Sequence, residues 1–94
     1  MANQRARRLT VHGRVQGVFF RAATRQQAQR HDLAGWVTNR SDGTVVAWLE
    51  GPADGVEAVE QWIRAGGPPR AVVEEVAAED VEPAGHPRFE VRRG

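Results

Sequence analysis

Apolar and polar residues alternate over several short stretches of this chain, which predicts strands whose two faces differ. The first such stretch is RRLTVHG, where Leu9 and Val11 alternate with Thr10 and His12. The further predicted strands are AGWVTN (34–39), TVVAWLEG (44–51), AVVEEVAAEDV (71–81) and RFEVR (88–92). The polar residues 1–6 precede the first strand, and we expect them to be frayed.

Two segments between the strands have helical character. RAATRQQAQRHDL (21–33) contains no Gly or Pro and is rich in good helix formers. Its inner face is expected to hold Phe20, Ala23, Ala28 and His31.

A second helix is predicted from Asp54 to the breaker sequence Gly66-Gly67-Pro68-Pro69. Asp54 followed by Glu57 resembles a capping box, and the apolar spacing of Val56, Val59 and Ile63 gives the helix one buried face.

The order strand, helix, strand, strand, helix, strand, with a short fifth strand, predicts a fold class. It is the α+β, ferredoxin-like βαββαβ sandwich, in which two helices cover one face of a four- to five-stranded, mostly antiparallel sheet. Asp42-Gly43 is the strongest hairpin signal. No linker or internal repeat interrupts residues 1–94, so one domain is expected. The residues expected to face the helices are Leu9, Val11, Val37, Val45, Ala47 and Leu49.

The opposite face of this sheet is predicted to carry Thr10, His12, Trp36 and Trp48. The two tryptophans fit two interpretations. They form a stacking platform for a ligand, or they cover a thin sheet; the second is the ordinary use of such residues.

Composition narrows the class of protein. The chain has 94 residues, no cysteine and no apolar run near the roughly 18 residues of a membrane span. Its start, MANQRARRLT, lacks the apolar core of a signal peptide. A cytoplasmic protein without disulfides or thiolate metal sites is therefore expected, with no membrane partner.

The charges are nearly balanced, at a formal net charge of +1, although all thirteen basic residues are arginine. Arginine binds phosphate with a planar fork, so the bias has a functional interpretation. Codon or thermal bias is the simpler explanation.

The stretch GRVQGVFFR (13–21) joins the first strand to the first helix. Its glycines permit a sharp turn, and the helix that follows presents unpaired N–H groups and the positive end of its dipole. With Arg21 in or near the first turn, the stretch suits an anion such as phosphate. A tight turn with a solvated Arg21 is the alternative, and spacing alone does not separate the two. Val18 and Phe20 are expected to anchor the loop in the core.

Asn39 ends the second strand on the same face as Val37, toward the loop. An asparagine before a turn is commonly a turn former. Opposite an anion-binding loop, its amide is also suited to holding a water molecule, because it is neutral and does not repel an incoming phosphate.

Other chemistry is poorly supported. His12, His31 and His86 lack metal-ligand spacing and are interpreted as surface or satisfied histidines. Ser41 has no nucleophile elbow around it, which excludes a serine hydrolase. The acidic residues Glu74, Glu75, Glu79, Asp80 and Glu82 are interpreted as a solvated face that protects an edge strand.

Taken together, VHGRVQGVFFR, GWVTNRSDGTV, EGP and AGGPPRAVVEEV closely resemble the acylphosphatase family, in the family's order and over about residues 7–92. The resemblance implies the same fold and the hydrolysis of acyl phosphates without metal, cofactor or covalent intermediate. The implied partners are a small acyl phosphate and inorganic phosphate or another anion as product or inhibitor, with a monomer as the expected state.

The resemblance also assigns residues. Arg21 is implied to bind phosphate and Asn39 to orient the attacking water. The backbone amides implied to cradle the phosphate belong to Gln16, Gly17, Val18, Phe19, Phe20 and Arg21. The position of Phe19 varies in the family, so its side chain is not expected to be catalytic. The ending RFEVRRG matches only loosely, which leaves its role open.

Two alternatives remain. Ferredoxin-like sheets also bind single-stranded RNA through exposed aromatics, but the RNA-binding signature is absent and the charge is balanced. Similar domains occur in larger carbamoyl-transferring proteins that handle carbamoyl phosphate, whose other regions this chain lacks.

Overall fold

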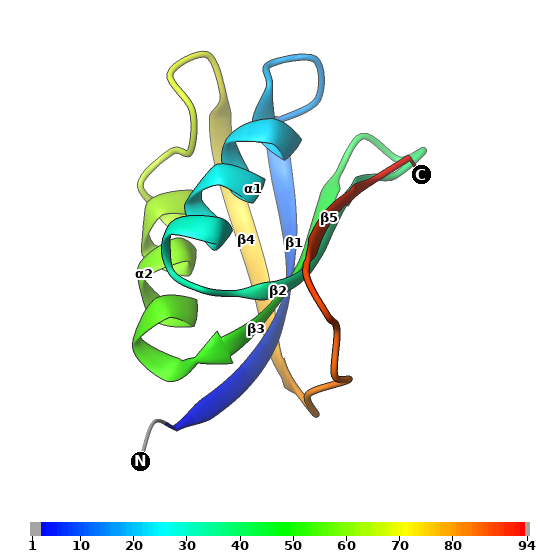
Figure 1. The fold of residues 1–94 in the computed structure, drawn as a ribbon. Coiled ribbons are helices and arrows are strands. Elements are labelled where there is room, and N and C mark those ends of the chain that lie inside the picture. Colours follow the sequence, from blue (N-terminus) through cyan, green and yellow to red (C-terminus); the bar gives the residue numbers. More distant parts are fainter. Residues whose placement is uncertain (1–2, 94) are drawn as a thin grey trace.

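A computed structural model describes residues 3–93. Its elements are β1 (Gln4–Arg14), α1 (Phe20–Arg30), β2 (Ala34–Asn39), β3 (Val45–Pro52), α2 (Ala53–Arg64), β4 (Val72–Val81) and β5 (Phe89–Arg92). The strands form one sheet in the order β4-β1-β3-β2-β5, and all neighbours are antiparallel except β2 and β5. Both helices lie on the same side of this sheet (Figure 1). The expected ferredoxin-like fold is confirmed, with β5 as an added edge strand.

The core lies between the sheet and the two helices. Every sheet residue expected to face the helices is buried in it: Leu9, Val11, Val37, Val45, Ala47 and Leu49. α2 adds Val56, Val59 and Ile63, at the predicted spacing. Within residues 3–93, no helix has the length and apolar character needed to cross a membrane.

The prediction that residues 1–6 are frayed is wrong for the part that the structure describes. β1 begins at Gln4, and Ala6 is buried. The carbonyl of Asn3 accepts a hydrogen bond from the N–H of Ala53 at 2.8 Å, which satisfies a donor at the start of α2. Pairing with β3 therefore orders a polar segment that has little local preference for a strand. Met1 and Ala2 lie outside the described residues.

The helix α1 is shorter than expected, and its inner face differs. It ends at Arg30, where Asp32 adopts the left-handed conformation with φ 58° and the N–H of Leu33 reaches the carbonyl of Ala28 at 2.9 Å. This is a Schellman-type end with aspartate in place of the usual glycine. Phe20 and Ala28 are buried as predicted, together with Thr24.

The expected inner-face residues Ala23 and His31 are only half-buried. Thr24 is buried instead, because Phe20, Thr24 and Ala28 are four positions apart and form one narrow stripe on the helix.

The predicted capping box at α2 is wrong. The helix begins at Ala53, one residue before Asp54, and Pro52 occupies the N-cap without any side-chain cap. The carboxylate of Asp54 instead accepts from the N–H of Gly55 at 3.0 Å. β3 runs directly into α2, so no loop residue is free to cap it. The helix ends before Gly66, as predicted.

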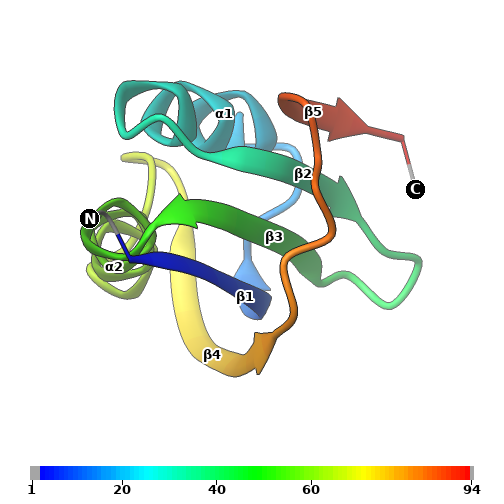
Figure 2. The ribbon, with the colours of Figure 1, turned by 60° about the horizontal axis from the view of Figure 1, so that its bottom comes forward.

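The sheet face away from the helices is covered by the connection between β4 and β5, which crosses from one sheet edge to the other (Figure 2). Trp36 and Trp48 stack with ring centroids 6.2 Å apart, and His86 of the connection meets Trp48 edge-on at 5.8 Å. The guanidinium of Arg92 lies 5.3 Å from the centre of Trp36. Residues of the chain itself therefore contact both rings of this aromatic pair, which supports the interpretation that the two tryptophans cover the sheet.

Glu50 fastens the same connection. This buried carboxylate accepts hydrogen bonds from the indole of Trp48 and from the N–H groups of Ala84, Gly85 and His86, at 2.8–3.2 Å. Burial alone raises the pKa of Glu50, but these bonds outweigh it and hold the pKa below its ordinary value.

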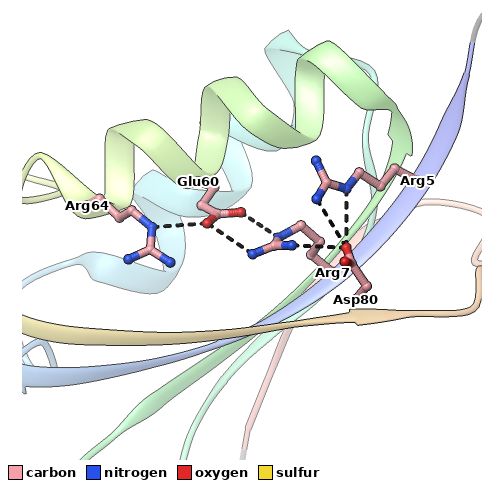
Figure 3. Close-up of polar contacts among 5 residues, drawn as sticks. All are labelled: Arg5, Arg7, Glu60, Arg64 and Asp80. Carbon is pink, nitrogen blue, oxygen red and sulfur yellow. Dashed lines mark hydrogen bonds and ion pairs between the residues drawn. The ribbon is translucent and has the colours of Figure 1, made fainter.

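A charged network joins β1, β4 and α2 on the face of the sheet that the helices cover (Figure 3). Arg7 pairs with Glu60 at 2.7 Å and with Asp80 at 3.0 Å. Arg64 reaches Glu60 at 3.0 Å, and Arg5 reaches Asp80 at 3.2 Å. β4 is an edge strand as expected, but its Asp80 is paired with arginines rather than simply solvated.

Candidate active site

The site begins beyond a bulge near the end of β1. The pairing of β1 with β4 shifts between His12 and Gly13, and Gly13 has φ 131°. A Cβ at Gly13 would lie 2.1 Å from the carbonyl oxygen of Val72, so only glycine fits this close approach. Residues 15–19 follow this bulge directly and connect β1 to α1.

Buried side chains fix this loop. Val15 and Phe20 are 1% and 2% exposed, and Val18 packs against the core. The anchoring roles predicted for Val18 and Phe20 are confirmed. Between the anchors, Gly17 has φ 74° and Phe19 has φ 61°, so the chain turns twice through the left-handed region. Such turns direct successive N–H groups to one side of a loop.

The amides of this loop are not used by the fold. The first helical bond of α1 runs from the N–H of Ala23 to the carbonyl of Phe19, at 3.0 Å. Within residues 3–93, the N–H groups of residues 16–22 donate to no backbone carbonyl. A row of free amides at a helix N-terminus attracts an anion, because both the N–H groups and the helix dipole favour negative charge.

Arg21 lies in the first turn of α1 and its guanidinium is held from the neighbouring edge strand. Nη1 donates to the carbonyl oxygen of Arg92 in β5 at 3.1 Å. No ion pair of Arg21 with an acidic residue is found in residues 3–93, so its positive charge is not neutralised by a carboxylate there. One donor is fixed by β5, and the rest of the fork is left for another acceptor.

Asn39 ends β2, where it pairs with Val45 of β3. Its Oδ1 is buried and has no hydrogen-bond partner among residues 3–93. A buried acceptor without a partner is rare, because its desolvation is not compensated. The oxygen is therefore suited to a donor that arrives with a ligand or a bound water.

Arg21 and Asn39 meet in one pocket of about 430 Å³, so the structure brings together the two side chains singled out from the sequence. Its complete lining is Val15, Gly17, Phe19, Phe20, Arg21, Ala22, Arg25, Asn39 and Val91. In the part of the chain that the structure describes, no acidic side chain lines it. The loop before α1, the turn after β2 and the end of β5 all lie at this end of the molecule (Figure 1).

The side chain of Gln16 ties the loop to the hairpin that follows Asn39. Its Nε2 donates to the carbonyls of Arg40 and Thr44 at 2.7 and 2.9 Å. Gln16 was expected only to offer its backbone amide, so this contact was missed. It spans more than twenty residues of sequence, and no local pattern announces it.

The hairpin itself is longer than a two-residue turn. Residues 40–44 connect β2 and β3, with a bond of 2.8 Å from the N–H of Arg40 to the carbonyl of Thr44. Asp42 accepts from the hydroxyl and the N–H of Thr44 at 2.6 and 3.0 Å, and these bonds hold the pKa of Asp42 below its ordinary value. Gly43 follows with φ 92°.

Four further residues of the pocket were not predicted from the sequence: Val15, Ala22, Arg25 and Val91. Arg25 lies one helical turn after Arg21, which was a usable signal, and Ala22 follows Arg21 in the first turn. Val91 enters only because β5 pairs in parallel with β2, a long-range register. Within residues 3–93, no group of three or more His, Cys, Asp or Glu side chains is placed to hold a metal ion.

Comparison with known proteins agrees with this geometry. The family model described as Acylphosphatase matches residues 7–91. The chain is 52% identical over 83 residues to the acylphosphatase of Gloeobacter violaceus, with 88% of each chain covered. Its fold superposes on the structure of an acylphosphatase from Coxiella burnetii with a TM-score of 0.91 and 38% identity, over 96% of this chain and 94% of that one.

A third match is of another kind. Full-length HypF, in a phosphate- and nucleotide-bound form, contains a segment that matches with a TM-score of 0.91 and 29% identity. That match covers 98% of this chain but 12% of HypF, so the same fold also occurs inside a much longer protein. The family-model match and the identity to full-length relatives are decisive: this chain belongs to the acylphosphatase family.

Proposed function

We propose that residues 1–94 act as a single acylphosphatase domain, which hydrolyses acyl phosphates to a carboxylate and inorganic phosphate. Family membership supports the reaction. The assignment to particular residues rests on one observation, which is that the proposed phosphate-binding and water-binding residues line one pocket. Arg21, with its guanidinium, and Asn39, with its unpartnered oxygen, line the same pocket. Three residues of the loop with free amides, Gly17, Phe19 and Phe20, line it as well, whereas Gln16 and Val18 line a neighbouring hollow.

In this proposal the phosphate group is bound by the loop. The amides of residues 16–21 donate to its oxygens, and Arg21 adds a charge-assisted pair of bonds. Because the anchors Val18 and Phe20 already fix the loop, little entropy is lost when the anion binds. The carbonyl of Arg92 holds Arg21 in place before the substrate arrives.

Asn39 is proposed to hold the attacking water. Its Oδ1 accepts one hydrogen bond from the water, whose lone pair then faces the phosphorus. A neutral amide suits this position, since a carboxylate there would repel the phosphate. The absence of acidic side chains from the lining, in the residues described, is consistent with that requirement.

The reaction then follows from the chemistry of a mixed anhydride. Water forms the new P–O bond while the bond between phosphorus and the acyl oxygen breaks, and the electron pair leaves with the carboxylate. A carboxylate is stable as an anion, so the leaving group needs little protonation. The proton of the water passes to a phosphate oxygen, without an enzyme base. Catalysis therefore rests on positioning and on neutralising the transferring phosphoryl group, and no metal or cofactor is part of it.

The alternatives are less well supported. The tryptophan pair needed for RNA stacking is covered by His86 and Arg92. The relative from Gloeobacter violaceus, at 52% identity, is named an acylphosphatase, which favours the hydrolase over a carbamoyl-phosphate-handling module. A cytoplasmic location and a monomeric state are also part of the proposal.

The residue assignment is tested by Arg21→Ala, assayed with benzoyl phosphate in the presence of EDTA. The variant should lose phosphate binding and turnover, because it removes the charge that the loop presents. Arg30→Ala, at the exposed other end of α1, is the matched control and should behave like wild type. Wild-type kinetics in Arg21→Ala would refute the proposed site.

The direction of attack is tested by hydrolysis in ¹⁸O-labelled water. Attack at phosphorus places the label in inorganic phosphate and leaves the carboxylate unlabelled. Label in the carboxylate would mean attack at the acyl carbon, and the proposed role of the loop would then be wrong.

A further inference from the structure

The mouth of the pocket carries exposed apolar side chains that the fold does not use. Among residues 3–93, the exposed large hydrophobic residues are Phe19 at 78%, Val72 at 53% and Val91 at 37%. Phe19 and Val91 line the pocket that contains Arg21 and Asn39. Exposed apolar side chains that gather at a pocket with polar groups indicate contact with a ligand.

The backbone conformation of Phe19 is one in which a phenylalanine is unusual. It has φ 61° and ψ 25° and is the N-cap of α1, but its side chain makes no cap hydrogen bond. The left-handed conformation is strained for a residue other than glycine. An N-cap is usually Ser, Thr, Asp or Asn. The phenyl ring thus brings neither burial nor capping, so stability does not explain it.

The location of the ring relative to the loop amides suggests its use. The acyl group is joined to the phosphate through one oxygen. When the loop binds the phosphate, the acyl group must extend toward the open side of the pocket. Phe19, at the start of α1, and Val91, in β5, line the pocket and are exposed there. The pocket volume of about 430 Å³ exceeds what a phosphate alone requires, and it lies in the range of small-ligand sites.

We propose that Phe19, together with Val91, forms an apolar acyl-binding rim that makes the enzyme prefer aryl or bulky apolar acyl phosphates over small ones. The inference rests on the proposed function and deepens it by naming the substrate class. The ring packs against the apolar acyl group, and the loop amides and Arg21 continue to bind the phosphate. Arg25, one turn after Arg21, lines the same pocket and is the competing determinant, because it would favour an acyl group with its own negative charge.

The experiment compares kcat/KM for benzoyl phosphate and acetyl phosphate in wild type, Phe19→Ala and Phe19→Leu, with EDTA present and the spontaneous rate subtracted. Phe19→Ala keeps an L-residue at φ 61°, so it removes the ring without relieving the backbone. It should lower kcat/KM for benzoyl phosphate about tenfold, the scale of one aromatic contact. Its kcat/KM for acetyl phosphate should stay within about twofold of wild type, and Phe19→Leu should fall in between. Val72→Ala, on the edge strand β4, is the control, and its kcat/KM should be unchanged for both substrates.

Three results would contradict the proposal that Phe19 and Val91 form an acyl-binding rim. Equal losses for both substrates would mean that the ring shapes the loop, and no loss for either would mean that the acyl group does not touch it. A wild-type preference for succinyl phosphate over benzoyl phosphate would assign selectivity to Arg25. If wild type hydrolyses none of these substrates, the proposed function fails and the rim fails with it, which is a different result from a lost preference.

Discussion

At the scale of single residues, the adjacent phenylalanines of GRVQGVFFR have opposite environments. Phe20 is 2% exposed and lies 6.1 Å, centre to centre, from the ring of Trp62 in α2. Phe19 is 78% exposed at the mouth of the pocket. The first residue of α1 therefore faces inward, while the N-cap before it faces outward. The same amino acid supports the loop at one position and, in our proposal, contacts the substrate at the next.

This difference gives a matched pair of stability predictions. Phe20→Leu should lower the free energy of unfolding by about 1–2 kcal/mol, because it leaves core space unfilled next to Trp62. Phe19→Leu should change it by less than about 0.5 kcal/mol, as is usual for exposed positions. Chemical denaturation of both variants measures the difference. Equal losses of stability in the two variants would show that Phe20 does not support the fold more than Phe19 does.

At the scale of elements, the site depends on contacts between segments that are distant in sequence. Gln16 links the loop to the hairpin after Asn39, and the carbonyl of Arg92 in β5 holds Arg21. Neither α1 nor the sheet edge could place these groups alone. The geometry of the site is thus a property of how the loop, β2 and β5 meet.

Gln16→Met tests the link between loop and hairpin. The variant keeps the length of the side chain but removes both donated bonds. We expect kcat to fall about tenfold with little change in KM, because the loop and Asn39 lose their fixed spacing. Stability should fall by about 1–2 kcal/mol, from two lost hydrogen bonds. Gln26→Met, on the exposed side of α1, is the control. An unchanged kcat in Gln16→Met would show that the bonds of Gln16 to the hairpin do not position the site.

A second element-scale prediction concerns pH and the connection that Glu50 holds. The pKa of Glu50 is lower in the folded protein than its ordinary value, so its stabilisation is fully present above the unfolded pKa. It is lost as pH falls through the folded pKa. Glu50→Gln should therefore cost about 2 kcal/mol at pH 7, from bonds to a charged acceptor, and this cost should shrink toward pH 3.

Urea unfolding of wild type and Glu50→Gln, followed from pH 7 to pH 3, measures this effect. Asp42 and Asp80 also have lowered pKa values and shape the acid response of both proteins alike, so the difference between them reports Glu50. A difference that stays constant over the whole range would show that the carboxylate charge is not what holds the connection.

At the scale of the whole molecule, the arginines serve more than one purpose. Arg21 and Arg25 line the pocket, whereas Arg5, Arg7 and Arg64 belong to the network that joins β1, β4 and α2 (Figure 3). Burial lowers the pKa of Arg7, but bonds to Asp80 and Glu60 outweigh it and raise the pKa above its ordinary value. The side chains of Arg7 and Glu60 are 15% and 13% exposed, so this pair is shielded from solvent.

Replacing Glu60 tests whether the network stabilises the fold. Glu60→Gln removes the charge that Arg7 and Arg64 share, and should lower the free energy of unfolding by about 1–2 kcal/mol, since Arg7 is largely buried. Glu79→Gln removes a carboxylate paired with Arg8 at exposed positions and should cost less than about 0.5 kcal/mol. Denaturant titration compares the two. Equal costs would mean that burial of the Arg7–Glu60 pair has no influence.

Much of the fold could be predicted from the sequence, because alternation and helical spacing are local. The strand AGWVTN and the position of Asn39 on the side of the loop follow from residue parity. The buried face of Val56, Val59 and Ile63 follows from helical spacing. The start of β1 and the cap of α2 were predicted wrongly, since a neighbouring strand orders the first and the direct passage from β3 decides the second. The contacts of Gln16 and Arg92 depend on how distant segments pair, which no local pattern encodes.

In the proposed site, Asn39 positions the water while the loop and Arg21 bind the phosphate. The most direct test measures kcat for benzoyl phosphate, with EDTA present, and the Kd of inorganic phosphate in the same preparations of wild type and Asn39→Ala. We expect kcat to fall at least about 100-fold, the scale of one preorganised polar group, while the phosphate Kd stays within about twofold of wild type. An unchanged kcat, or a loss of phosphate affinity as large as the loss of rate, would contradict these roles.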